Sequence, residues 1–271
     1  MILRSLFAAA LVFGSVTSAS AFDMPPPIDA PEYTGTIAGV GGWYIRGDLG
    51  YNASIKGDKP TQRAYDFDIN APGYTSSEFD KARFDKDLTL NAGIGYQFND
   101  FLRADFTVDY FKSTLNGKSD WANCTSVDGT LCSFRKEDMS AMGLLANGYV
   151  DLGTYWGLTP YAGAGAGVSY VKWGDVDQSV LCTKCDEVDY KMTTSSGSDS
   201  WRFTYALMAG VSYDIASNIK LDVGYRFSQV AGGDMFNFNA YESAFGATGA
   251  KAKENGFVRH EFRTGVRVVG W

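Results

Sequence analysis

Four cysteines have the residue type and spacing that could most directly do chemistry in this chain. Cys182 and Cys185 are separated by two residues, a spacing shared by zinc ligands and redox-active pairs. A thioredoxin-like site needs a βαβ unit around it, which the surrounding pattern does not indicate, and zinc is the weaker alternative in an oxidising compartment. We therefore expect disulfides among Cys124, Cys132, Cys182 and Cys185 and no metal. Three pairings are possible, of which 124–132 and 182–185 are the simplest.

The single histidine, His260, is the natural candidate for general-base chemistry. Hydrolytic sites of that kind place the histidine beside a serine or an acid. Glu261 is its neighbour in sequence, but adjacent residues of a strand point to opposite faces. His260 shares its parity with Phe262, which predicts a position on the outer face or its rim. The sequence thus predicts that the chain is not an enzyme and needs no cofactor.

Charged residues alternate with apolar ones along several stretches. In the segment 102–110, for example, apolar side chains occupy the even positions, and Arg103, Asp105 and Asp109 lie between them. Such alternation is typical of a strand with one polar and one apolar face. The polar faces together carry Arg46, Asp48, Arg103, Asp105, Asp109, Asp151, Arg202, Asp214, Lys220, Asp222, Arg226, Arg259, Glu261, Arg263 and Arg267.

The alternating stretches predict eight strands. They cover residues 43–52, 87–98, 101–112, 139–152, 159–171, 201–214, 219–228 and 257–269. Long polar segments (53–86, 113–138, 172–200 and 229–256) alternate strictly with short connections (99–100, 153–158 and 216–218). A soluble sandwich or soluble barrel has no reason to sort its connections by length, whereas outer-membrane barrels have short periplasmic turns and long extracellular loops. We therefore predict an all-β fold over 43–271: an eight-stranded, antiparallel, up-and-down transmembrane β-barrel with four long extracellular loops, closed because lipid forbids open sheet edges.

Barrel width determines what the inward charges can do. An eight-stranded barrel is just wide enough for side chains to fill, and buried charges must be paired. The sequence therefore predicts a network of ion pairs that plugs the lumen, and a narrow water path lined by the same charges is the alternative.

Three glycines, Gly163, Gly165 and Gly167, fall at every second position of one strand. They predict room for bulky lumen neighbours rather than a phosphate loop.

Aromatic residues gather near the predicted strand ends. Rings with a polar tip are stable at headgroup depth. We expect two aromatic girdles that include Trp43, Tyr51, Tyr96, Phe98, Phe101, Tyr110, Tyr170, Trp201, Phe203, Tyr213, Tyr225, Phe227 and Trp271.

The N-terminus has the features of an export signal. Arg4 precedes a short apolar run, and Ala19-Ser20-Ala21 matches a small-x-small cleavage site. We predict a signal peptide at 1–21, a proline-rich flexible periplasmic lead at 22–42 and the barrel at 43–271. A net charge of −7 without a basic stripe argues against nucleic acid as a partner.

Several segments resemble a known family. The start Met24-Pro25-Pro26-Pro27, the predicted hairpin at 94–105 and the strand at 221–227 are similar to the small outer-membrane β-barrel proteins of alphaproteobacteria, a group of surface antigens related to the membrane domain of OmpA. This resemblance covers nearly the whole mature chain.

The resemblance implies a bacterial outer-membrane location and a role in envelope structure, with surface contact or adhesion by the loops. A small-solute porin-like channel is the alternative. The implied partners are outer-membrane lipid and lipopolysaccharide, a host or phage surface, and the barrel-insertion machinery, which would read the C-terminal strand. Trp271 is out of phase with Val266 and Val268, and a bulge at Gly270 would restore its parity. The sequence leaves the oligomeric state open.

Overall fold

A computed structural model describes residues 41–66, 73–78, 81–119, 125–126, 129–182 and 188–270. Only the backbone is described at 81–83, 117–119, 125–126, 129–137, 176–182 and 188–194. All described residues belong to one compact unit, Gly39–Trp271. The predicted signal peptide and most of the predicted lead lie outside the described residues, so both remain predictions.

Eight antiparallel strands pair in a closed ring. Each strand pairs with the next in chain order, and the last pairs with the first through a register that runs from Tyr44 opposite Val269 to Gly57 opposite Phe257. The fold is therefore the predicted antiparallel up-and-down β-barrel. Its strands are β1 (Gly42–Gly57), β5 (Leu88–Gln97), β6 (Leu102–Ser119), β8 (Gly129–Asp151), β9 (Leu158–Trp173), β12 (Asp199–Ala216), β13 (Ile219–Asn237) and β14 (Ala250–Val269).

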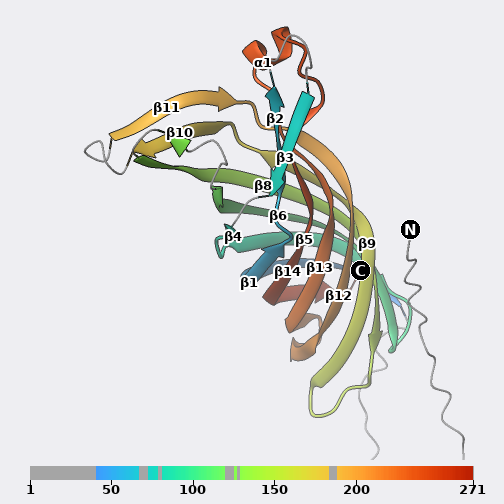
Figure 1. The fold of residues 1–271 in the computed structure, drawn as a ribbon. Helices are drawn as coiled ribbons and strands as arrows, with labels where there is room; N and C mark the ends of the chain where they lie inside the picture. Colours follow the sequence, from blue (N-terminus) through green and yellow to red (C-terminus); the bar gives the residue numbers. More distant parts are fainter. Residues whose placement is uncertain are drawn as a thin grey trace, which may run out of the picture. The chain divides into compact units, whose positions relative to one another are not determined.

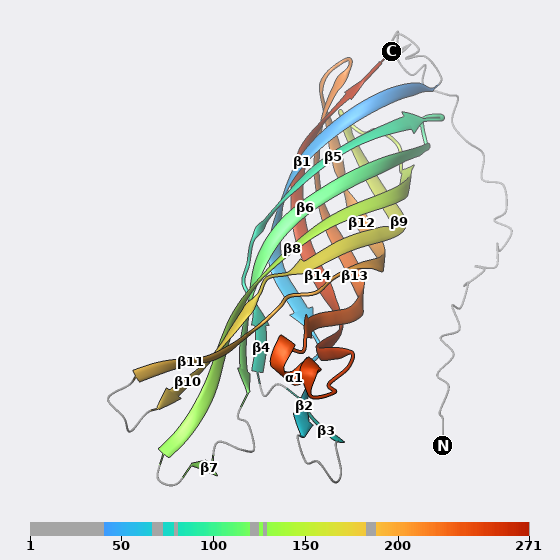
Figure 2. The same cartoon turned by 90° about the horizontal axis from the view of Figure 1, so that it is seen from above.

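The remaining elements lie at one end of this ring. They are β2 (Thr61–Asp66), β3 (Gly73–Glu78), β4 (Lys81–Phe84), β7 (Thr125–Ser126), β10 (Val176–Cys182), β11 (Val188–Ser195) and α1 (Ala240–Ala244). Figures 1 and 2 show the β10–β11 hairpin projecting beyond the ring, and α1 with β2 and β3 opposite the end at which β14 stops. We call the end that carries these remaining elements the loop end. The opposite end, which carries the three short connections, is the turn end.

The long connections differ from the expectation of polar loops, because strands continue far into them. β6 runs to Ser119 rather than ending near 112, and β14 begins at Ala250 rather than at 257. β10 and β11 also join the same sheet, at the edge of β8. Inward apolar side chains in these extensions pack on one another, so the antiparallel ladder continues past the aromatic residues. Within the described residues, no helix is long and apolar enough to cross a membrane.

The strands separate inward from outward side chains at every second residue. Burial alternates without interruption from Trp43 to Asn52 in β1, and Trp43, Ile45 and Leu49 on its outer face are about half exposed. A continuous apolar outer wall of this kind is the surface that lipid covers. The inward side chains fill the barrel, and their contacts define the candidate site.

Candidate functional site

The structure brings thirteen of the fifteen predicted inward charges into the buried interior. The other two, Asp214 and Lys220, are partly exposed and pair with each other beside the turn at the turn end. Of the buried thirteen, Arg202 pairs with Glu254 near the loop end, apart from the rest. Each of the other twelve has at least one ion-pair partner within the set, and the pairs form four neighbouring groups. We call the set the lumen network: Arg46, Asp48, Arg103, Asp105, Asp109, Asp151, Asp222, Arg226, Arg259, Glu261, Arg263 and Arg267.

At its loop-end side the network spans the barrel from wall to wall. Asp109 on β6 accepts hydrogen bonds from Arg226 on β13 and from Arg259 on β14, each at 3.2 Å. Strands β6 and β13 lie on opposite sides of the eight-stranded ring. Glu261 accepts a further bond of 2.6 Å from each of Arg259 and Arg263. The two bonds to Asp109 join β6 to β13 and β14 through the interior.

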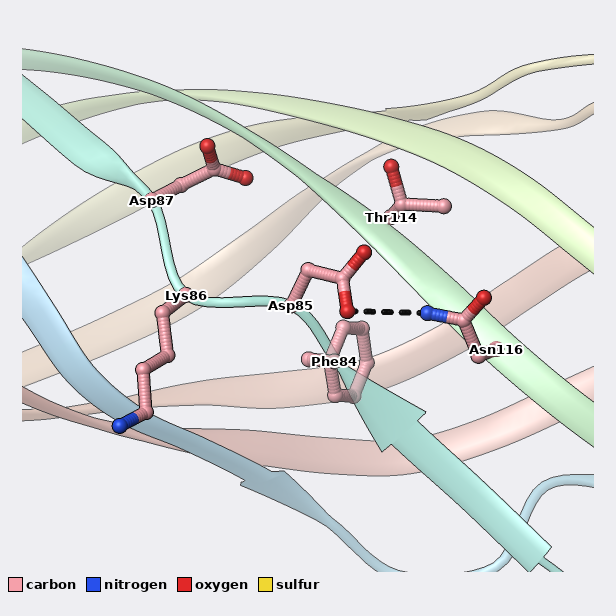
Figure 3. A pocket seen from close by; sticks show the side chains of 6 residues that line it. All are labelled: Phe84, Asp85, Lys86, Asp87, Thr114 and Asn116. Atoms are coloured by element: carbon pink, nitrogen blue, oxygen red, sulfur yellow. Dashed lines mark hydrogen bonds between the residues drawn. The ribbon is translucent and has the colours of Figure 1, made fainter.

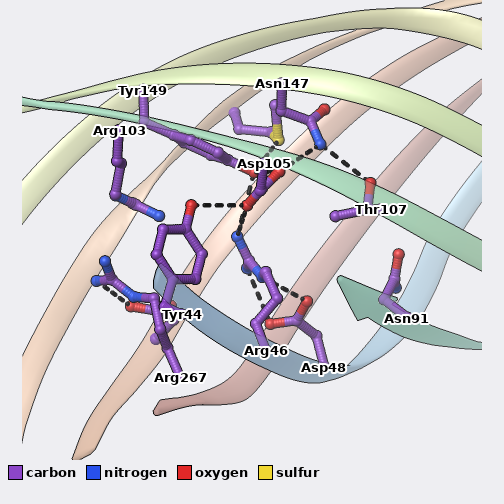
Figure 4. Close-up of polar contacts among 12 residues, drawn as sticks. Tyr44, Arg46, Asp48, Asn91, Arg103, Asp105, Thr107, Asn147, Tyr149 and Arg267 are labelled. Carbon is purple, nitrogen blue, oxygen red and sulfur yellow. Dashed lines mark hydrogen bonds and ion pairs between the residues drawn. The ribbon is translucent and has the colours of Figure 1, made fainter. Parts of the chain in front are cut away.

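The middle of the network is centred on Arg46 and Asp105 (Figure 4). Arg46 donates to both carboxylate oxygens of Asp48 and, at 3.1 Å, to Asp105 on β6, the next strand but one. Asp105 also accepts hydrogen bonds from Asn147 at 2.7 Å and from the Tyr44 hydroxyl at 3.1 Å. Its carboxylate is therefore held by a cation and a hydroxyl from β1 and by an amide from β8.

The turn-end side is less completely bonded. Arg103 pairs with Asp151 at 3.1 Å and lies over the rings of Tyr149 and Tyr161. The Nη1 and Nη2 atoms of Arg103, Nη1 and Nε of Arg267, and Oδ2 of Asp222 are buried without a hydrogen-bond partner among the described residues. Oδ2 of Asp222 and Nε of Arg267 still form an ion pair at 3.3 Å. Asn91, Arg226 and Trp173 each also carry a buried nitrogen without a partner, towards the loop end, so unmatched polar atoms that favour solvent occur on both sides of the network.

The lumen network is balanced in charge, with six arginines and six carboxylates. Each carboxylate has at least one arginine partner within 3.3 Å. Buried charges are tolerated in such pairs, whereas a single unpaired one is very costly. The arrangement therefore pairs each buried charge with an opposite one, and the predicted plug remains a prediction. The described residues contain no group of three or more histidine, cysteine or acidic side chains arranged to hold a metal.

A second layer, which is apolar, covers the network on the loop-end side. We call it the apolar layer; it contains Phe84, Phe111, Leu115, Met139, Val171, Trp173, Val230, Met235, Phe236 and Phe257. Its rings cross the interior. The ring centres of Phe84 on β4 and Trp173 on β9 are 6.3 Å apart, and so are those of Phe111 on β6 and Phe257 on β14. Arg259 joins the two layers, because its guanidinium lies 3.8 Å from the centre of the Phe111 ring.

Sequence reasoning missed the apolar layer and Glu254. Phe111 was the available signal, because it has the parity of Asp109 and therefore points inward. Glu254 lay inside a segment that was expected to be a loop, and only the extension of β14 gives it an inward position beside Arg202. The buried tyrosines Tyr44 and Tyr149 follow directly from inward parity.

Two of the three alternating glycines of β9 give room to lumen side chains. A Cβ on Gly163 would lie 2.5 Å from the Tyr149 ring, and one on Gly165 would overlap the Asn147 amide. Both neighbours belong to the polar centre of the lumen, so these glycines allow large side chains of β8 to lie flat against β9.

None of the twelve described girdle candidates is buried. Trp43, Tyr96, Phe98, Phe101 and Tyr213 lie towards the turn end. Tyr51, Tyr110, Tyr170, Trp201, Phe203, Tyr225 and Phe227 lie towards the loop end. Neighbouring rings touch, as in Trp43–Tyr96 at 5.4 Å between ring centres.

The last girdle candidate, Trp271, lies outside the described residues. Strand β14 ends at Val269, and Gly270 has a φ of +110°. The girdle role and the insertion signal remain predictions.

His260 lies on the outer side of β14. Its ring is hydrogen-bonded to the Tyr225 hydroxyl, and its ring centre lies 5.7 Å from that of Phe227, among the aromatic residues towards the loop end.

Of the cysteines, Cys124 and Cys185 lie outside the described residues. The backbone register places Cys132 opposite Leu181 and Cys182 opposite Leu131. The disulfides therefore remain a prediction.

Comparisons with known proteins agree with this architecture. The family model described as an outer membrane protein beta-barrel domain matches residues 7–248. An uncharacterized protein of Brucella abortus is 37% identical over 274 residues, which cover 93% of each chain. A Rickettsia bellii protein that is named as a candidate adhesin is 24% identical over 225 residues, covering 83% of this chain and 86% of its own.

Among solved structures, the outer membrane protein OprG of Pseudomonas aeruginosa matches with a TM-score of 0.44 and 16% identity, over 85% of this chain and 96% of its own. The closed antiparallel ring, the apolar outer wall and the family match over most of the chain lead to one conclusion. The chain belongs to the outer membrane protein β-barrel family and resides in the bacterial outer membrane.

Proposed function

We propose that this protein is a non-catalytic barrel that remains closed to solutes and supports ordered loops for contact at the cell surface. The observation that carries the proposal is the layering of the interior. A charge-balanced network crosses the lumen, and an apolar layer lies over it. Water and ions would have to pass both layers, and an apolar constriction disfavours wetting.

The described contacts between two of the long connections support a contact role. The β2–β3 hairpin packs against the connection between β13 and β14. The Tyr65 hydroxyl donates to the Phe245 carbonyl at 2.8 Å, and the Thr248 amide donates to the Tyr74 hydroxyl at 2.8 Å. Hydrogen bonds from Thr248, with the nearby positive charge of Arg63, lower the pKa of the Tyr74 hydroxyl. Loops that are held in one conformation lose less entropy when they bind a partner.

Two aromatic rings form the exposed part of this surface. Tyr241 on α1 and Phe245, which follows the helix, are 65% and 57% exposed, and their ring centres are 4.8 Å apart. A capping box between Asn239 and Glu242 fixes the start of this short helix. Exposed aromatics are typical of interface anchors. Together with the adhesin name of the Rickettsia relative, they favour contact with a host or phage surface.

Adherence of bacteria that display the protein on an epithelial monolayer tests the contact role. We expect display of the wild-type chain to raise adherence. The double substitution Tyr241→Ser and Phe245→Ser should weaken the contact about 25-fold, since two aromatic anchors at about 1 kcal/mol each contribute about 2 kcal/mol.

The matched control removes two exposed aromatics at the turn end, Tyr155 and Trp156, and should leave adherence unchanged. Heat-modifiable migration on gels verifies that each variant folds. Wild-type adherence equal to that of cells without the protein would refute the contact role.

The alternative function, a small-solute channel, is favoured by one observation. Arg103, Arg267 and Asp222 carry unmatched buried polar atoms near the turn end, so that part of the lumen suits solvent. The apolar layer at the other end opposes a continuous path.

A further inference from the structure

The hairpin that carries α1 leaves the ring at a gap in the sheet. Strands β12 and β13 pair residue by residue as far as Thr204 opposite Val230, and the ladder does not continue to Arg202 within the described residues. There β12 remains paired with β9, while β13 continues with β14. Contact between the two segments resumes where the Ser198 amide, just before β12, donates to the Met235 carbonyl at 2.8 Å. The base of the β13–β14 hairpin is therefore separated from β12 by an open stretch of the ladder.

The side chain of Arg202 bridges this gap. Arg202 is buried, and its guanidinium donates to the Glu254 carboxylate on β14 and, at 3.0 Å, to the Asp234 carbonyl on β13. Its Nε atom donates to the Ser200 hydroxyl, on its own strand, at 3.0 Å. The Glu254 carboxylate also accepts a hydrogen bond from the amide of Gly256. One planar group with donors in a fixed fork thus joins three strands where the backbone ladder is open.

Two glycines of β13 make room for this contact. Gly233 pairs with Glu254 in the register, and a Cβ on Gly233 would lie 2.7 Å from Nε of Arg202. A Cβ on Gly232 would lie 2.5 Å from the Glu254 carbonyl oxygen. Glycine also leaves the backbone more conformations than any other residue does. The hairpin can therefore bend at the level where the arginine contacts it.

A second gap in the wall is closed by the backbone instead. Between β4 and β5, the Asp85 amide donates to the Thr114 carbonyl at 2.9 Å, and the Asn52 amide donates to the Asp87 carbonyl at 2.8 Å. Figure 3 shows the side chains at that gap, where Asp85 accepts a hydrogen bond of 3.0 Å from Asn116, and both of these residues are exposed. At the gap between β12 and β13, a buried charged side chain makes the connection. The position of the β13–β14 hairpin therefore depends on that side chain.

We propose that Arg202 is a positioning residue for the contact surface: it holds the base of the β13–β14 hairpin against β12 and so sets the direction in which Tyr241 and Phe245 project. This role rests on the proposed contact function. A buried carboxylate is stable only beside its cation, and Glu254 is buried. The hairpin cannot swing away from β12 without separating this pair inside the protein. The contact therefore selects one orientation of the hairpin, and a fixed orientation lowers the entropy that binding a partner costs.

Hydrogen exchange of the refolded protein, measured by mass spectrometry, tests the proposal. In an Arg202→Gln variant, Glu254 loses its cation, and glutamine has too few donors on too short a chain to reach both strands. Loss of a charged hydrogen bond shifts an opening equilibrium at least about tenfold. Backbone amides of residues 231–256 should therefore exchange about tenfold faster than in the wild type, whereas those of the barrel ladder at 204–230 should be unchanged. The adherence gain of cells that display the variant should also fall.

A second variant and a matched control separate the local contact from general stability. Arg202→Lys keeps a cation beside Glu254, so it should fold as the wild type does. Lysine lacks the planar fork and cannot also reach the Asp234 carbonyl, so exchange of the hairpin should still be faster. The control is Arg103→Gln, which makes the same change in a buried arginine that pairs with Asp151 at the turn end and should leave exchange at 231–256 unchanged.

Three results would overturn the proposal. Unchanged exchange in both Arg202 variants would mean that the arginine does not hold the hairpin. Equal acceleration in the Arg103→Gln control would mean a general loss of stability. Faster exchange with undiminished adherence would mean that contact does not depend on the direction of the hairpin. Exchange is measured without a partner, so a failure of the contact role itself would appear separately, as wild-type adherence no higher than that of cells without the protein.

Discussion

The Asp109→Asn variant is expected to lose about 3–5 kcal/mol of unfolding free energy, because it removes one partner of a buried ion-pair network. Asp109 neutralises Arg226 and Arg259 from across the barrel, and both contacts are 3.2 Å long. Asparagine has nearly the same shape but no charge. The two guanidinium groups would then share the remaining carboxylate of Glu261 in a closed interior.

Urea unfolding in lipid vesicles, followed by tryptophan fluorescence, measures this loss. The control is Asp214→Asn, which makes the same chemical change in the partly exposed pair with Lys220 at the turn end. Exposed pairs contribute about 0–1 kcal/mol, so this control should unfold nearly as the wild type does. Equal losses in the two variants would contradict the account of a buried, interdependent network.

Truncation of the apolar layer should have an effect of similar size. Phe257→Ala removes a ring that is 1% exposed and that contacts Phe84 and Phe111 from two other strands. A large-to-small change in a packed interior costs the transfer free energy and the cavity, about 3–5 kcal/mol for phenylalanine. The same urea titration measures the change.

The comparison for this variant is Phe245→Ala, directly after α1, where the residue is 57% exposed. Surface substitutions usually remain within about 0.5 kcal/mol of the wild type. A loss below about 1 kcal/mol for Phe257→Ala would mean that the layer is loosely packed and that this part of the interior is already accessible to water.

The alternation of apolar and polar residues in the sequence predicts most of the barrel. Alternation specifies which side chains share a face, so inward Arg46 and outward Ile45 follow directly from it. The strict order of long and short connections specifies up-and-down pairing. The strand ends could not be predicted in this way, because β14 continues through Ala250–Gly256, where small residues, glycine and lysine obscure the alternation.

Partners across the lumen could not be predicted either. Parity brings Asp109 and Arg226 into the same interior, but the tilt and stagger of the ring decide which charges meet. The same holds for the apolar layer, because four barrel strands, two short connections and one long connection separate Phe84 from Trp173 in the sequence. Only closure of the ring brings these two residues within reach of each other.

Single-channel conductance of the refolded, heat-modifiable protein in planar bilayers tests the closed lumen most directly. The layered interior predicts no stable steps from the wild-type chain at moderate voltage. Reproducible steps whose size shifts in an Arg226→Ala variant would contradict it, because current would then pass the charges that are proposed to fill the barrel.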